Sequence, residues 1–110
     1  ILWAADELGI TLKFVGQGVD EYGVVEAISG DRAPALKAGD LIVKIDPRYF
    51  RPTEVETLLG DLSRARQKLR WVPKISEQKM CKAMVAHDLE HAKRHALLKQ
   101  HGYHVFTEGE

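Results

Sequence analysis

The most informative stretch of the sequence is Asp46-Pro47-Arg48-Tyr49-Phe50-Arg51-Pro52-Thr53-Glu54-Val55-Glu56-Thr57-Leu58-Leu59-Gly60-Asp61. It follows residues 41–45, a short apolar run rich in β-branched residues that predicts a strand. Asp46-Pro47 ends this strand, because proline cannot donate to a strand pairing and disfavours helix in the residue before it. Pro52 suits the first turn of a helix, and Glu54 and Glu56 place negative charge near the positive end of the helix dipole. The sequence therefore predicts a strand, a turn and then a helix that begins near Pro52.

Arg51 and Glu54 are the candidate binding residues of this stretch. They are three positions apart, so a helix beginning at Pro52 would let both face one spot. A guanidinium offers a planar set of donors that matches phosphate oxygens, and a helix N-terminus adds free N–H groups. A nearby carboxylate can accept hydrogen bonds from a ribose diol. The pair is suited to a nucleotide diphosphate, and the competing interpretation is an ordinary surface ion pair.

The stretch from Asp46 to Asp61 resembles the signature near the C-terminus of the GDP-mannose 4,6-dehydratases, extended short-chain dehydrogenases that act on nucleotide sugars. The resemblance continues through Trp71, Pro73-Lys74-Ile75 and the segment from Met84 to Tyr103, and it includes Leu8-Gly9-Ile10 upstream. It covers essentially the whole chain. Two positions depart from the family pattern, which has proline at Leu62 and glycine at Arg70. If that glycine has a positive φ as a helix cap, arginine there costs about 1 kcal/mol.

This resemblance implies an α/β fold in which residues 1–110 form the C-terminal part of a nucleotide-sugar substrate-binding domain, with a small mixed sheet and a long C-terminal helix. The intact enzyme would be an NADP-dependent lyase that converts GDP-mannose to GDP-4-keto-6-deoxymannose and water. It would be a cytoplasmic homo-oligomer, with neither nucleic acid nor a membrane as partner. Carried onto this sequence, Arg51 would contact the diphosphate and Glu54 the ribose. Arg48 is a third candidate substrate contact, or it braces the loop by pairing with Asp46 or Glu54.

The catalytic and cofactor-binding residues of such an enzyme are expected outside this chain. Gly16-Gln17-Gly18 lacks the third glycine of a dinucleotide-binding turn, and the chain opens at Ile1 in an apolar helical stretch. We therefore expect a fragment without its N-terminal Rossmann half and without turnover of its own. Two enzyme alternatives remain, a nucleotide-sugar reductase and an epimerase. A PDZ-like peptide-binding module is a further alternative, suggested by residues 34–42.

Composition limits the classes of partner. The 16 basic and 16 acidic residues of the 110-residue chain cancel, so a bulk positive field for nucleic acid or anionic lipid is not expected. Hydrophobic residues make up 45% and charged residues 29%, as in soluble globular chains. The single cysteine, Cys81, falls in a predicted helix and is expected to be buried or half-buried, which fits a reducing compartment.

Local patterns predict the remaining elements. A helix ending at Gly9 precedes alternating strands at residues 10–14 and 24–28. Asp61 or Ser63 should cap another helix, and Ser76 should cap a long helix that ends at Gly102. Tyr49 and Phe50 are expected in the core or the site wall, and Trp71 and Ile75 in the core. The expected inner side of the helix after Asp61 is Ala65 and Leu69. The expected buried stripe of the long helix is Met80 or Cys81, Met84-Val85, Asp88-Leu89, Ala92 and Ala96.

Two further sets of polar residues have the composition of a metal site. Asp20 and Glu21 stand at the tip of a glycine-rich loop, and we expect a solvated loop rather than a metal site. His87, His91 and His95 recur every fourth residue on the long helix, which stacks their imidazoles on one face. Two such residues can bind zinc or nickel, but a functional centre needs a third ligand, so no functional metal site is predicted.

Overall fold

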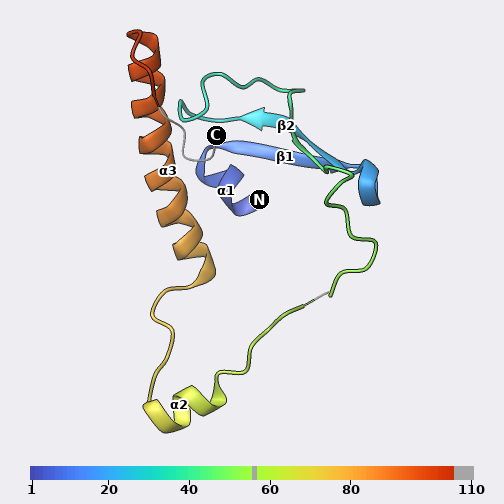
Figure 1. Ribbon diagram of the computed structural model, residues 1–110, viewed down its shortest axis with the longest axis vertical. Coiled ribbons are helices and arrows are strands. Elements are labelled where there is room, and N and C mark those ends of the chain that lie inside the picture. Colours follow the sequence, from blue (N-terminus) through green and yellow to red (C-terminus); the bar gives the residue numbers. More distant parts are fainter. Residues whose placement is uncertain (56, 106–110) are drawn as a thin grey trace.

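The computed structural model of the chain describes residues 1–55 and 57–105 (Figure 1). It contains a small three-stranded sheet and helices on either side of a long extended excursion. The expectation of a small α/β unit with a long C-terminal helix is confirmed. In chain order the elements are α1 (Leu2–Glu7), β1 (Ile10–Val15), the single 3-10 turn η1 (Gly18–Asp20), β2 (Tyr22–Ile28), β3 (Leu41–Lys44), α2 (Ser63–Leu69) and α3 (Glu77–Gln100).

The sheet is antiparallel throughout, in the order β1-β2-β3. In β1 and β2 the pairing runs from Ile10 opposite Ile28 to Val15 opposite Tyr22, and β3 adds its Val43 opposite Gly23. Alternate residues of β1 are buried or half-buried, as the predicted period of two requires. All three predicted strands are therefore present, with ends shifted by one or two residues.

The core of the described chain is small and lies where α1 packs on the sheet. Ala5 of α1, Ile10 of β1 and Val25 of β2 are its buried apolar residues, with Val25 only 1% exposed. Partly buried neighbours surround them: Leu8, Leu12, Ile28, Ala33 and Leu36. This cluster fixes the first 45 residues as one packed unit.

Gly9 makes the close connection between α1 and β1 possible. Its φ is +73°, and a Cβ at this position would lie 2.0 Å from the carbonyl oxygen of Ser29. The backbone N–H of Ser29 donates to the Gly9 carbonyl at 2.8 Å, so the two backbones touch directly. Only glycine satisfies both the left-handed conformation and this approach.

The prediction of a helix beginning near Pro52 is wrong for the residues that the structure describes. Residues 51–55 and 57–62 are extended or irregular, and Glu56 lies outside the described residues. The side chains that would form an inner helix face are open to solvent: Val55 is 68% exposed, Leu58 91% and Leu59 93%. A helix this short is marginal in water unless tertiary packing holds one face, and residues 1–55 and 57–105 leave Val55, Leu58 and Leu59 uncovered.

The extended excursion carries α2, which lies far from the sheet in Figure 1. The N-cap of α2 is Leu62, without a side-chain hydrogen bond, so the prediction that Asp61 or Ser63 caps this helix is wrong. The Asp61 carboxylate accepts hydrogen bonds from the backbone N–H and the hydroxyl of Ser63 at 2.9 and 2.5 Å. These bonds lower the pKa of Asp61. Arg70 ends the helix in the left-handed conformation, with φ +53° and ψ +25°, which is the strained cap that the sequence predicted.

The apolar residues around α2 do not form the core expected of them. Leu69 is 76% exposed, Trp71 52% and Ile75 68%, although Ala65 is half-buried. The prediction that Trp71 and Ile75 fill a core is therefore wrong for this chain alone. Their pattern is that of a buried segment, but the described chain supplies no surface against them.

α3 is the long C-terminal helix that the sequence predicted. The Ser76 hydroxyl accepts from the Lys79 N–H at 3.3 Å, and Gly102, with φ +79°, closes the other end. There Tyr103 N–H donates to the Leu98 carbonyl at 3.0 Å, a standard glycine-dependent cap.

The predicted buried stripe of α3 is largely wrong. No residue of α3 is buried: Cys81, Val85 and Leu89 are half-buried along one line, and Met80 and Met84 are more than half exposed. Asp88, Ala92 and Ala96 are exposed as well. The expected half-buried state of Cys81 is confirmed.

The described chain is more extended than a self-contained domain. Its radius of gyration is 18.4 Å, whereas a compact domain of this length has about 13 Å. Much apolar surface consequently stays open along residues 49–75. Among the described helices, none is both long and apolar enough to cross a membrane.

Candidate functional site

The candidate site begins with a tight turn at the end of β3. Pro47 holds the second position of the turn, and the Tyr49 N–H donates to the Asp46 carbonyl at 3.0 Å. The Asp46 carboxylate accepts from the Arg48 N–H at 3.0 Å, which is the local bonding that makes aspartate common in turns. The sequence Asp-Pro-Arg-Tyr thus fixes its own backbone.

The guanidinium of Arg48 is committed to Asp46. Its Nε lies 3.2 and 3.1 Å from the two carboxylate oxygens, and one terminal nitrogen lies 2.7 Å from Oδ2. The side-chain and backbone hydrogen bonds from Arg48 lower the pKa of Asp46, and the carboxylate raises the pKa of Arg48. Of the two partners expected for Arg48, Asp46 and Glu54, its guanidinium pairs with Asp46.

Arg51 and Glu54 lie side by side on the segment that follows this turn. Arg51 Nε is 3.9 Å from Glu54 Oε1, and the two side chains are 78% and 67% exposed. At this distance they form an ion pair without a close hydrogen bond, so most donors of the guanidinium stay free for a ligand. The pair can offer a fork of donors to an anion and an acceptor to a hydroxyl group at one point on the surface.

The helix N-terminus expected to help bind an anion here is absent, because residues 52–55 are not helical. Any anion at this point would therefore depend on side chains alone. Tyr49 is 77% exposed, with its ring 5.5 Å from the Arg48 guanidinium carbon, so the expectation that it packs in a core or wall is wrong for this chain.

Phe50 connects the segment to the rest of the sheet unit in a way that the sequence did not indicate. A Cβ built on Gly18 would lie 3.7 Å from the tip of the Phe50 ring, so the ring lies over the backbone of η1. Phe50 is 39% exposed, about half the exposed fraction of Tyr49. Phe50 therefore anchors the residue immediately before Arg51, in the wall role that the sequence allowed for it.

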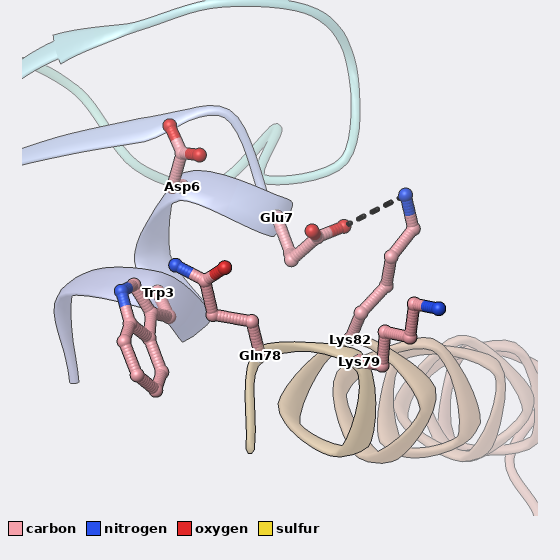
Figure 2. Close-up of a pocket in the computed structure, with 6 residues that line it drawn as sticks. All are labelled: Trp3, Asp6, Glu7, Gln78, Lys79 and Lys82. Carbon is pink, nitrogen blue, oxygen red and sulfur yellow. Dashed lines mark ion pairs between the residues drawn. The ribbon is translucent and has the colours of Figure 1, made fainter. Parts of the chain in front are cut away.

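A second concave region lies between α1 and α3 (Figure 2). It has a volume of about 290 Å³, and Glu7 and Lys82 form an ion pair of 3.9 Å across it. Its lining residues are Trp3, Asp6, Glu7, Gln78, Lys79 and Lys82. This cleft could not be predicted from the sequence, because it depends on α3 packing against α1. Its lining brings acidic and basic side chains together.

Asp20, Glu21 and the glycines of the loop before them do not assemble into a site. Asp20 belongs to η1 and Glu21 follows it, and in the described part of the chain no group of three or more His, Cys, Asp or Glu side chains could hold a metal ion. Gly16 and Gly18 do have positive φ, but they lead into η1 and then the antiparallel strand β2. A dinucleotide pyrophosphate needs a helix N-terminus at that point, so these residues do not fit such a cofactor.

Comparison with known proteins points to one family. A family model described as GDP-mannose 4,6 dehydratase matches residues 1–84. A GDP-mannose 4,6-dehydratase of Vibrio cholerae is 67% identical over 105 residues, which is 96% of this chain and 28% of that protein. One from Yersinia enterocolitica is 56% identical over 93% of this chain and 27% of its own length. GDP-mannose 4,6 dehydratase 1 of Arabidopsis thaliana is 54% identical over 56% of this chain and 17% of that protein. The chain thus spans little more than a quarter of the length of the Vibrio and Yersinia relatives.

Proposed function

The chain belongs to the GDP-mannose 4,6-dehydratase family, and from this we propose that residues 1–110 form the C-terminal part of the substrate-binding domain of a longer enzyme of that family. The identity to the Vibrio and Yersinia proteins extends over nearly the whole chain but over little more than a quarter of each relative. The open apolar side chains support the proposal, since Leu58, Leu59 and Ile75 have the character of a buried interface and find no partner here. The remainder of the longer protein would cover them.

The function proposed for this chain is to bind the GDP part of GDP-mannose. The observation that carries it is the position of Arg51 beside Glu54, both accessible, in a segment that falls within the region matched to the family. Arg51 would bind the diphosphate and Glu54 the ribose hydroxyls. Arg48 would brace the turn through Asp46, and its exposed guanidinium remains a candidate for a second phosphate contact.

The chemistry of the reaction is assigned to residues outside this chain. We propose that the longer enzyme is an NADP-dependent lyase that oxidises the mannose at C4, removes water across C5 and C6, and returns the hydride to C6. Gly16 and Gly18 do not lead into the helix N-terminus that a dinucleotide pyrophosphate needs, so no step of the reaction is assigned to this chain. Residues 1–110 alone are predicted to show no turnover of GDP-mannose, and turnover by the isolated chain would contradict this division of labour.

The expected partners and location of the longer enzyme remain proposals of the same kind. We propose a cytoplasmic homo-oligomer that binds GDP-mannose and neither nucleic acid nor a membrane. The reductase and epimerase alternatives are not favoured, because the relatives compared are GDP-mannose 4,6-dehydratases. The PDZ-like alternative is not favoured either, since the family match runs through residues 34–42, on which it was based.

The experiment is calorimetric titration of GDP into the longer enzyme and its Arg51→Ala variant. Loss of a charged hydrogen bond to the diphosphate should weaken binding by about 1.5 to 3 kcal/mol, or roughly tenfold to 150-fold. Arg64→Ala, which removes an exposed arginine from α2, is the matched control and should leave the affinity unchanged. Equal affinity of wild type and Arg51→Ala would remove Arg51 from the site.

The role of Glu54 is separated from that of Arg51 by the choice of ligand. Glu54→Ala should weaken binding of GDP, and it should have much less effect on GDP lacking both ribose hydroxyls, because the lost acceptor then has no donor to serve. If both ligands lose the same affinity, Glu54 acts by holding Arg51 and not by binding the ribose. Titration with UDP in parallel tests whether the base is recognised by the longer enzyme.

A further inference from the structure

Three histidines form a row along α3 that has no part in the proposed GDP site. His87, His91 and His95 follow one another at intervals of four residues. The rings of His87 and His91 are stacked with centroids 6.5 Å apart, and those of His91 and His95 are closer, at 5.1 Å. His87 and His91 are exposed and His95 is half-buried. The row is thus open to ions from solvent along a rigid helix.

The two histidines nearest to each other are the better pair of ligands. Neutral imidazole suits copper, nickel and zinc, and residues four apart on a helix project on the same side. The ring of His87 lies farther from that of His91, at 6.5 Å, and its Nδ1 lies 3.3 Å from the carboxylate of Asp88. We propose that His91 and His95 together bind one divalent transition-metal ion on the surface of α3, with water completing its coordination.

The nature of the site follows from what surrounds it. No group of three or more His, Cys, Asp or Glu side chains able to hold a metal occurs among residues 1–55 and 57–105, so this is a two-ligand surface site rather than a structural or catalytic centre. Glu90 is already paired with Lys93 at 3.2 Å, and Arg94 adds a further positive charge beside His95. Because both protein ligands are imidazole nitrogens, the site should bind Ni²⁺, Cu²⁺ or Zn²⁺. It should not bind Mg²⁺, which prefers oxygen ligands.

Binding would also stabilise the part of α3 in which it occurs. α3 has no buried residue, so its C-terminal half is held by backbone hydrogen bonds and capping more than by packing. An ion that joins two successive turns binds the helical state alone and stabilises it by mass action. Slower amide hydrogen exchange around residues 91–99 is the expected sign of this.

The test is a calorimetric titration of Ni²⁺ into the longer enzyme, made without a histidine tag. Hydrogen exchange of α3 is then measured with and without Ni²⁺. His91→Gln and His95→Gln should each weaken Ni²⁺ binding by about tenfold or more, because one ligand of a chelating pair is lost. His87→Gln and His101→Gln are the matched controls and should change it by less than about threefold. Circular dichroism should show the same helix content in all four variants.

Two results would overturn the proposal. Unchanged Ni²⁺ affinity in a variant that carries both His91→Gln and His95→Gln would show that the ion binds elsewhere. A loss in His87→Gln equal to that in His91→Gln, with none in His95→Gln, would move the site to the other pair. Protection from exchange that appears with Ni²⁺ in wild type and disappears in both single variants would support it.

Discussion

Glycine in place of Arg70 should make α2 more stable than alanine does at the same position. Arg70 ends this helix at φ +53°, and its side chain is exposed, so the substitution removes no buried contact. A residue with a Cβ pays roughly 1–2 kcal/mol for the left-handed conformation. Glycine avoids this cost but loses about 0.5–1 kcal/mol more backbone entropy on folding. The backbone part of the change is therefore a gain of about 0.5–1 kcal/mol of local helix stability, from which the loss of the Arg70 charge has to be subtracted.

The charge of Arg70 must be separated from its backbone conformation. A cation near a helix C-terminus contributes about 0.3–1 kcal/mol, and glycine removes it together with the Cβ. Arg70→Ala is the matched reference, because it loses the guanidinium and keeps the Cβ. Compared with Arg70→Ala, Arg70→Gly should therefore be more stable by the full backbone difference, whatever the charge contributes.

The assay is amide hydrogen exchange of residues 63–71 in the longer enzyme, read by mass spectrometry under native conditions. A gain of about 0.5–1 kcal/mol slows local opening by roughly twofold to fivefold. The order expected from slow to fast exchange is Arg70→Gly, Arg70→Asn and Arg70→Ala, since asparagine tolerates the left-handed region better than alanine. Faster exchange in Arg70→Gly than in Arg70→Ala would refute the reasoning, because it would mean that residue 70 is not left-handed.

Two further predictions concern the sheet unit and the turn after it. Gly9→Ala should lower the free energy of unfolding by about 1–3 kcal/mol in chemical denaturation, because its Cβ would meet the Ser29 carbonyl at 2.0 Å; Gly60→Ala, which has open space around it, should change it little. The Asp46 carboxyl should titrate below its ordinary value of 3.8 in an NMR experiment, and Arg48→Ala should return it toward that value. Since this pKa is lowered in the folded chain, the turn is stabilised above about pH 4 and loses that contribution as the pH falls through the lowered pKa. A midpoint that Arg48→Ala leaves unmoved would count against the pairing.

The elements predicted correctly are those whose cause is local. Alternating apolar residues gave β1 and β2, Ser76 and Gly102 gave both ends of α3, and the departure at Arg70 marked a left-handed cap. Each of these depends on bonds or periods within a few residues. Such signals persist whether or not the rest of a protein is present.

The predictions that failed depend on partners distant in sequence. The apolar residues after Pro52 have the spacing of a helix face, yet a short helix needs a surface to pack on. In the part of the chain that the structure describes, Leu58 and Leu59 have no such surface. Trp71 fails as a core residue for the same reason. The cleft between α1 and α3 was not predicted, because no local pattern indicates which helix returns to which.

The candidate site shows both behaviours. Arg51 and Glu54 were expected to meet because a helix would bring them to one face, and they do lie 3.9 Å apart although that helix does not form. A spacing of three residues suffices in a bent chain. The fixed geometry of the preceding turn, by contrast, follows directly from Asp46 and Pro47 and could be anticipated.

The packing of α3 against α1 has a consequence for how the chain tolerates change in length. The segment between β3 and Ser76 starts from the sheet unit, and it ends at α3, which packs back against α1 of the same unit. The segment is therefore a long loop that is held at both ends. The entropic free-energy cost of closing a flexible loop grows only with the logarithm of its length, by about 0.6 kcal/mol for each doubling of the number of residues. Insertions or deletions between Leu58 and Trp71 should therefore be inexpensive for the sheet unit. The same deletions between Asp46 and Glu54 would displace the binding side chains, so the two halves of one excursion are under different constraints.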